Sequence, residues 1–297
     1  IFLDVLAINT YGLNTTSFIY IPFCFLGGYL ISLRFTDDEY LEVYEAVMFF
    51  LALSSLLLYV MVVISPSVVS SFPTYTYHDF TSKTLLFLNV LTFENSVVFR
   101  SCGFASEPGL YQLFLNVALW ARFKRVSNFD VHSVIYIASI ITTNSTVGLV
   151  IMSGIVFLNI KGLKKVWLIF FIVLLMPIIY PIIEYHVVHK LVGSASFDGR
   201  LIPFINAFTL AIDNPWGLGS ILYTEIYKDI NIGGWDSFSQ VVLRYGAQGL
   251  LLLIFILSRI YKYDLILFGI LLTTMLSQSI WFLPVVTCFY FWSLDRK

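Results

Sequence analysis

Residues 43–64 read VYEAVMFFLALSSLLLYVMVVI, and this stretch decides the fold class. From Ala46 to Ile64 it contains no charged residue. An α-helix rises about 1.5 Å per residue, so about 20 apolar residues cross the hydrocarbon core of a bilayer. The stretch therefore predicts a membrane-spanning helix.

The composition of the 297-residue chain points to the same class. Hydrophobic residues make up 59%, charged residues 12%, and the mean hydropathy is +0.87. Soluble domains are about a quarter charged, and a soluble globule of this size cannot bury so much apolar surface. A soluble enzyme, a disordered chain and a fibrous chain are thus excluded. The net charge of −1, without a basic stripe, excludes nucleic-acid binding.

We expect an all-α fold, a polytopic transmembrane helical bundle that forms one integral-membrane domain over residues 1–297. Candidate segments are 17–34, 43–64, 107–121, 130–143, 146–160, 166–183, 237–258, 263–283 and 284–294, which makes about nine in all. The polar run Thr142–Thr146 favours two short helices over one between 130 and 160. The apolar stretch 80–93 is too short to span a membrane, so we interpret it as interfacial or re-entrant. The start at Ile1 predicts an N-terminal truncation.

Basic residues in short loops give the orientation, because Lys and Arg are enriched on the cytoplasmic side. In the expected topology 11 of the 17 basic residues share one side: Arg34, Arg122, Lys124, Arg125, Lys161, Lys164, Lys165, Arg259, Lys262, Arg296 and Lys297. The other six are Lys83, Arg100, Lys190, Arg200, Lys228 and Arg244. The long loops 65–106 and 184–236 are therefore expected to face outward, where most polar residues gather.

The first loop ends in Arg100-Ser-Cys-Gly-Phe-Ala-Ser-Glu107-Pro108-Gly109. Pro is tolerated in the first turn of a helix, so Ser106 is expected as an N-cap with Glu107 near the positive end of the helix dipole. The functional alternative is a guanidinium and a carboxylate placed together at the membrane surface for an anionic headgroup.

The second loop contains Asp198-Gly199-Arg200, an amphipathic stretch 201–212 and the turn sequence 213–220. Asp198 and Arg200 form either a weak surface ion pair or part of a binding site. Asp236 precedes the segment 237–258 as a helix N-cap or as a functional carboxylate, and Arg244 follows two turns later.

Metal and disulfide sites are not indicated. His186 and His189 lack a third ligand nearby, so we interpret them as interfacial residues. The three cysteines (Cys24, Cys102 and Cys288) are scattered and odd in number. No metal and no cofactor is expected.

Taken in order, these pieces resemble the O-antigen polymerase and ligase superfamily over about residues 85–260. The matching residues are Arg100, Gly103, Glu107, Pro108 and Gly109; Thr142 to Thr146; Gly199 and Arg200; Asn214, Pro215, Gly217 and Gly219; and Tyr245, Gly246 and Gly249. Ligases of the superfamily carry a His-Asn pair where this chain has Trp235 and Asp236, which favours the polymerases.

The resemblance implies a membrane glycosyltransferase of the bacterial inner membrane. Its substrates are oligosaccharide repeat units on undecaprenyl diphosphate, polymerised at the periplasmic face into O-antigen for lipopolysaccharide, or into capsular or exopolysaccharide. Arg100 and Arg200 would hold the diphosphate, Arg244 would contact substrate, and Asp236 would be the general base, with Glu107 as the alternative. A chain-length regulator is a partner to expect. An O-antigen ligase is the near alternative, and a transporter or flippase of lipid-linked sugars is the distant one.

Overall fold

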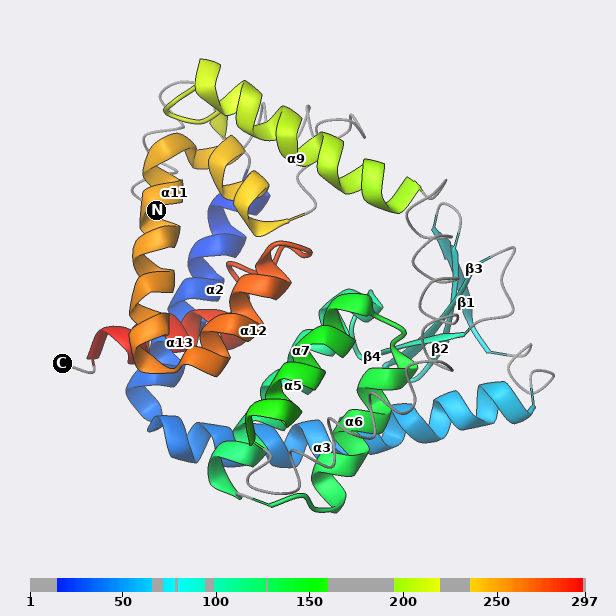
Figure 1. The fold of residues 1–297 in the computed structure, drawn as a ribbon. Coiled ribbons are helices and arrows are strands. Elements are labelled where there is room, and N and C mark those ends of the chain that lie inside the picture. The colour runs from blue at the N-terminus through cyan, green and yellow to red at the C-terminus, as the bar shows by residue number, and fades with distance from the viewer. Residues whose placement is uncertain are drawn as a thin grey trace. The chain divides into compact units, whose positions relative to one another are not determined.

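The computed structural model describes residues 15–65, 72–77, 80–93, 99–126, 128–159, 195–219 and 236–295 (Figure 1). The chain divides into two compact units. Unit 1 comprises residues 1–28, 160–259 and 279–290, and unit 2 comprises residues 29–159, 260–278 and 291–297. Each unit is described by itself. The predicted segment 166–183 lies outside the described residues.

Unit 2 is built on the helices α3 (Asp37–Ile64), α5 (Pro108–Arg125), α6 (Val131–Thr142), α7 (Thr146–Asn159) and α12 (Leu265–Met275). Helix α3 begins before its apolar stretch because Thr36 and Glu39 form a capping box. The predicted break between α6 and α7 is confirmed: a turn at Thr143-Asn144 separates them, and Asn144 has a φ of 47°. Helix α12 ends at Met275, so the prediction of one helix over 263–283 is wrong.

The all-α prediction is wrong for the loop that precedes α5. Four strands, β1 (Thr74–Tyr77), β2 (Phe80–Leu85), β3 (Leu88–Phe93) and β4 (Arg100–Gly103), form an antiparallel sheet in the order β1-β2-β3-β4. The strands are rich in Thr, Tyr, Phe, Val and Leu, most of which favour extended backbone. The stretch 80–93 is thus a β-hairpin, and it packs onto α3 through Leu88 and Val90.

Unit 1 contains α9 (Ala195–Asp213) and most of α11 (Ser237–Tyr263). Helix α2 (Thr15–Arg34) begins in unit 1 and ends in unit 2, and so does α13 (Pro284–Asp295). Ala207 of α9 and Leu243 of α11 share a buried cluster with Leu218. Helix α11 is interrupted at Gly246, whose φ of 62° and ψ of −152° are not helical.

Two of the described helices, α3 and α11, are long and apolar enough to cross a membrane by length and composition. The shorter apolar helical stretches in the described ranges, such as Tyr20–Arg34 and Ile202–Asp213, are 10–17 residues long. The structure therefore supports a mostly helical protein, and it leaves the bundle of nine spans as a prediction.

Candidate functional site

The predicted site residues are divided between the two units. Arg100 and Glu107 belong to unit 2, whereas Arg200, Asp236 and Arg244 belong to unit 1.

In unit 2, Arg100 holds the break between α6 and α7. Its Nε donates to the carbonyl oxygen of Thr143 and its Nη2 to that of Asn144, both at 3.1 Å. Carbonyls at the C-terminus of a helix lack partners within the helix and attract a cation. Arg100 thus connects the motif that it begins, Arg100–Gly109, to the polar run Thr142–Thr146. The bonded residues are 43 and 44 positions apart in sequence.

A glycine and a tyrosine fix the turn that follows Arg100. Gly103 has a φ of 52°, and a Cβ at this position would overlap the ring of Tyr111. The Tyr111 hydroxyl lies 2.6 Å from the Ser55 hydroxyl, so this turn is anchored to α3.

Burial raises the pKa of the Cys102 thiol to about 12, which keeps it protonated and a poor nucleophile.

Glu107 lies at the N-cap position of α5 and is exposed. Pro108 occupies the first turn as predicted, but the assignment of Ser106 as the N-cap is wrong. The Glu107 side chain makes no capping hydrogen bond. Its carboxylate therefore projects into solvent at the positive end of the helix dipole, next to the turn that Arg100 precedes.

In unit 1, Asp236 is a buried carboxylate at the start of α11, with 6% of its surface exposed. Its Oδ1 accepts the backbone N–H of Ser239 at 2.8 Å, and its Oδ2 accepts the Ser239 hydroxyl at 2.5 Å. The prediction of an N-cap is confirmed. Burial raises the pKa of Asp236, although the hydrogen bonds from Ser239 oppose that rise.

A row of buried polar side chains on α11 continues from Asp236. The Ser237 hydroxyl accepts the backbone N–H of Ile280 at 2.9 Å. The side-chain oxygen of Gln240 accepts hydrogen bonds from the Ser279 hydroxyl and from the indole N–H of Trp281. These contacts tie the first turn of α11 to residues 279–281 and hold Asp236 on a fixed backbone. This row was not predicted, although Ser237 and Gln240 lie inside the predicted segment 237–258.

The two glycine motifs of unit 1 interlock around Gly217 and Gly246. The backbone N–H of Ala247 donates to the Pro215 carbonyl at 2.9 Å, and that of Leu218 donates to the Leu243 carbonyl at 2.7 Å. Gly217 has a φ of 84°. A Cβ on Gly246 would lie 2.5 Å from the amide nitrogen of Gly217, so neither position tolerates a side chain.

Residues 215–218 thus cross residues 243–247 of α11 in close contact. Arg244 lies at this crossing and is half-buried. Its carbonyl lies where a Cβ on Gly217 would be placed. Arg200 lies within α9, which begins at Ala195, so the prediction that Gly199 and Arg200 precede a helix is wrong. The side chain of Arg200, together with His186, His189 and Trp235, lies outside the described residues.

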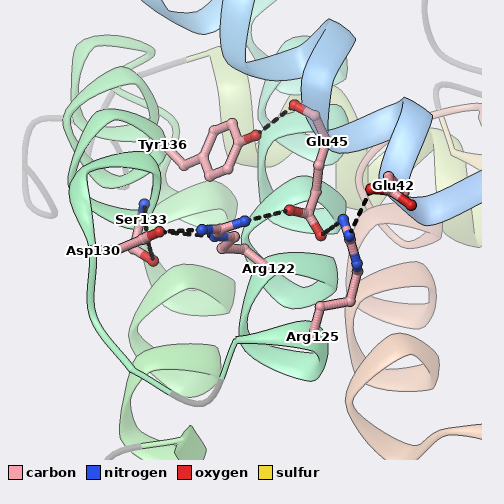
Figure 2. Close-up of polar contacts among 7 residues, drawn as sticks. All are labelled: Glu42, Glu45, Arg122, Arg125, Asp130, Ser133 and Tyr136. Carbon is pink, nitrogen blue, oxygen red and sulfur yellow. Dashed lines mark hydrogen bonds and ion pairs between the residues drawn. The ribbon is translucent and has the colours of Figure 1, made fainter. Parts of the chain in front are cut away.

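An ion-pair network around the buried carboxylate of Glu45, at the other end of α5, was not predicted (Figure 2). Glu45 of α3, with 3% of its side chain exposed, pairs with Arg122 and Arg125 at 3.2 Å each. Arg122 also pairs with Asp130, the N-cap of α6. The hydrogen bonds from Arg122 and Ser133 outweigh the effect of burial and hold the pKa of Asp130 at about 2.

The acidic residues at the start of α3 were the available signal for this network. The positive-inside rule depends on Lys and Arg alone, so it does not indicate that acidic side chains neutralise Arg122 and Arg125. Among the described residues, no group of three His, Cys, Asp or Glu side chains is arranged to hold a metal ion.

Comparison with protein-family models, with curated proteins and with solved structures finds no match to this chain.

Proposed function

We propose that this chain is a membrane glycosyltransferase that polymerises oligosaccharide repeat units carried on a polyprenyl diphosphate, at the outer face of the bacterial inner membrane. The proposal is supported by contacts between the sequence motifs, two motifs in each unit. Arg100 contacts the polar break of α6 and α7, and Gly217 contacts Gly246 ten residues after the buried Asp236.

The reaction requires a general base and groups that bind the leaving diphosphate. A hydroxyl of the acceptor sugar attacks the anomeric carbon of the donor, a glycosidic bond forms, and the bond from that carbon to the lipid diphosphate breaks. The hydroxyl proton passes to a general base, and the diphosphate leaves with its negative charge. Preorganised guanidinium groups stabilise that charge better than water does.

Asp236 is the proposed base, because burial raises its pKa toward the range in which a carboxylate accepts a proton more readily. Exposed Glu107 is the alternative. Arg100 and Arg200 form the proposed diphosphate clamp, and Arg244 is a further substrate contact. The two carbonyls that accept from Arg100 fix the direction of its guanidinium.

The alternatives lack a supporting contact among the described residues. Trp235 stands in place of the histidine of the ligase pair, which argues against a ligase. A transporter of lipid-linked sugars would place ionisable groups at the centre of its spans. Glu45 lies instead at the charged end of α3, beside Arg122 and Arg125.

A reconstituted reaction tests the proposal. The purified chain in lipid vesicles receives undecaprenyl-diphosphate-linked repeat units, and the products are separated by size. We expect a ladder of polymers, and Asp236→Asn lowers its rate by about 10²-fold or more. Transfer of a single finished chain to a lipid-A core, without a ladder, would favour the ligase. Unchanged substrate with well-folded protein would contradict both enzymes.

Arg200 gives the most specific test of the diphosphate clamp. A planar guanidinium binds two phosphate oxygens together, whereas lysine offers one point charge. Arg200→Ala should abolish the ladder without loss of protein from the membrane, and Arg200→Lys should remain clearly impaired. If Arg200 only pairs with Asp198, the pair is worth less than about 1 kcal/mol at an exposed site, and both Arg200→Ala and Asp198→Ala keep the ladder.

A further inference from the structure

The turn between β2 and β3 exposes apolar side chains on an unfavourable backbone. Leu85 pairs with Leu88, which leaves Leu86 and Phe87 as a two-residue turn. Leu86 has a φ of 58° and is 87% exposed, and Phe87 is 48% exposed. Turns with this first φ usually carry glycine there. The chain thus presents a leucine to the surroundings where glycine would fit better, which is the kind of outlier that points to a function.

The residues beside the turn are anchored on α3. Leu88 and Val90 share a buried cluster with Leu58 and Val62 of α3, and Leu85 packs against it. The same part of α3 exposes Leu57, Met61 and Ile64 on its other side. The turn and this part of α3 therefore both expose apolar side chains.

The depth of the turn follows from the length of α3. Between the ion pairs of Glu45 and the end at Ile64, α3 rises about 28 Å, which matches a hydrocarbon core of about 30 Å. Leu58 lies six residues before Ile64, which is about 9 Å inside that outer end. If α3 spans the membrane, the hairpin contacts it within about 9 Å of the outer boundary of the hydrocarbon.

We propose that Leu86 and Phe87 insert into the outer leaflet at the boundary between headgroups and acyl chains, and so seat the four-stranded sheet on the membrane surface. The inference rests on the membrane placement in the proposed function. Insertion is shallow, because the backbone polar groups of the turn still need water. The next pair along the hairpin is polar: the Thr84 hydroxyl donates to the Asn89 side-chain oxygen at 2.7 Å, and Lys83 follows.

Lipid fits this turn better than a protein partner does. A stable protein interface buries about 800 Å² on each partner. One leucine and one phenylalanine at the tip of a hairpin offer only a part of that area, whereas a shallow lipid anchor needs no more than a small apolar surface. A bilayer also covers the exposed side of α3 at the same depth.

A fluorescence experiment on the full chain in vesicles tests the inference. Leu86→Cys carries an environment-sensitive label, and Ser106→Cys carries the same label at an exposed position of the same unit. The parent chain measures background labelling of its three buried cysteines. The vesicles contain phosphatidylglycerol and phosphatidylethanolamine, with a nitroxide either near the carboxyl end or near the methyl end of the acyl chain.

We expect the label at residue 86 to shift its emission to the blue, and the shallow nitroxide to quench it more than the deep one. Iodide in the water should quench it several-fold less than the label at residue 106. A label on Phe87→Cys should behave like that at residue 86. Equal iodide quenching at 86, 87 and 106 in reconstituted protein would overturn the inference and leave the turn for a protein partner.

The same samples separate this inference from the proposed function. A chain that alkaline carbonate releases from the vesicles has no membrane placement, which overturns both. A water-exposed turn on a chain that still makes the polymer ladder overturns only the inserted turn. A lipid-quenched turn on a folded chain that makes no ladder keeps the inserted turn and removes the polymerase.

Discussion

At the scale of single residues, Asp236 shows what local sequence does and does not predict. Its role as an N-cap followed from an acid placed before an apolar helix, because capping depends on neighbours within one turn. Its neighbours Ser237 and Gln240 bond to residues 279–281, about 40 positions away, and no local pattern indicates that contact. Arg100 is similar, because its carbonyl partners at Thr143 and Asn144 are set by tertiary packing.

The hydrogen bond from Ser239 makes the proposed base testable by pH. The Ser239 hydroxyl stabilises the charged form of Asp236, so Ser239→Ala should raise the pKa of Asp236 further. A base works only when it is deprotonated, so the rate falls as the pH drops through its pKa. The acid limb of the pH–rate profile should therefore move to higher pH in Ser239→Ala.

Ser258→Ala is the control, since Ser258 lies on the same helix, is exposed and bonds only locally to Phe255. An acid limb that stays in place in Ser239→Ala, while Glu107→Gln removes it, would transfer the role of base to Glu107.

The crossing of Gly217 and Gly246 gives a prediction for stability. Gly246→Ala must accept a φ of 62° and a clash with the 215–217 backbone, which should cost about 3 kcal/mol or more. Gly154→Ala on α7 meets open space and should gain up to about 1 kcal/mol. Thermal unfolding of the detergent-solubilised variants measures both, and similar melting temperatures would show that the crossing tolerates a side chain.

At the scale of elements, apolar length and polar breaks predicted helices better than they predicted the sheet. Helices α6 and α7 begin and end within one or two residues of their predicted segments, because Asp130 and the Thr142–Thr146 run are local signals. The hairpin 80–93 was not predicted, because the length of an apolar stretch shows only whether it can span a membrane. Strand pairing depends instead on register with a partner strand. The end of helix α12 at Met275, before a polar turn, was not predicted, because the mean hydropathy of the segment 263–283 stays high across that turn.

The ion pairs between α3 and α5 lead to a matched pair of variants. Glu45 and Glu42 both contact Arg125, but the Glu42 side chain is 70% exposed. Glu45→Gln should cost about 2–3 kcal/mol, because it removes a buried carboxylate that pairs with two partly exposed arginines. Glu42→Gln should cost less than about 1 kcal/mol, since exposed ion pairs contribute little. Equal melting temperatures for the two variants would mean that the network does not hold α3 to α5.

At the scale of the whole molecule, the sequence predicted the mostly helical composition but not the division into two units. Apolar content is a sum over the whole chain, so a prediction based on it stays correct when single elements are assigned wrongly. Which residues cluster into one unit depends on contacts between distant segments, and α2, α11 and α13 each contribute to both units.

The predicted topology is tested by reporter fusions. Because 11 of the 17 basic residues fall on one expected side, a reporter fused after Arg125 or Lys165 should read as cytoplasmic, and one near Gly193 as external. A periplasmic phosphatase and a cytoplasmic fluorescent protein report opposite sides, so each position is read twice. A cytoplasmic reading at Gly193 would contradict the outward placement of the loop 184–236.

The distance in sequence between Glu45 and Arg122 has a consequence in time. The two residues are 77 positions apart, and a ribosome adds about 5–20 residues per second. Glu45 is therefore synthesised about 4–15 s before Arg122, and Arg125 follows directly. During that interval the acid has neither arginine, so α3 cannot take its final place until α5 has been made. The nascent chain must keep this end of α3 in contact with water, or with a helper that supplies positive charge, until the second helix arrives.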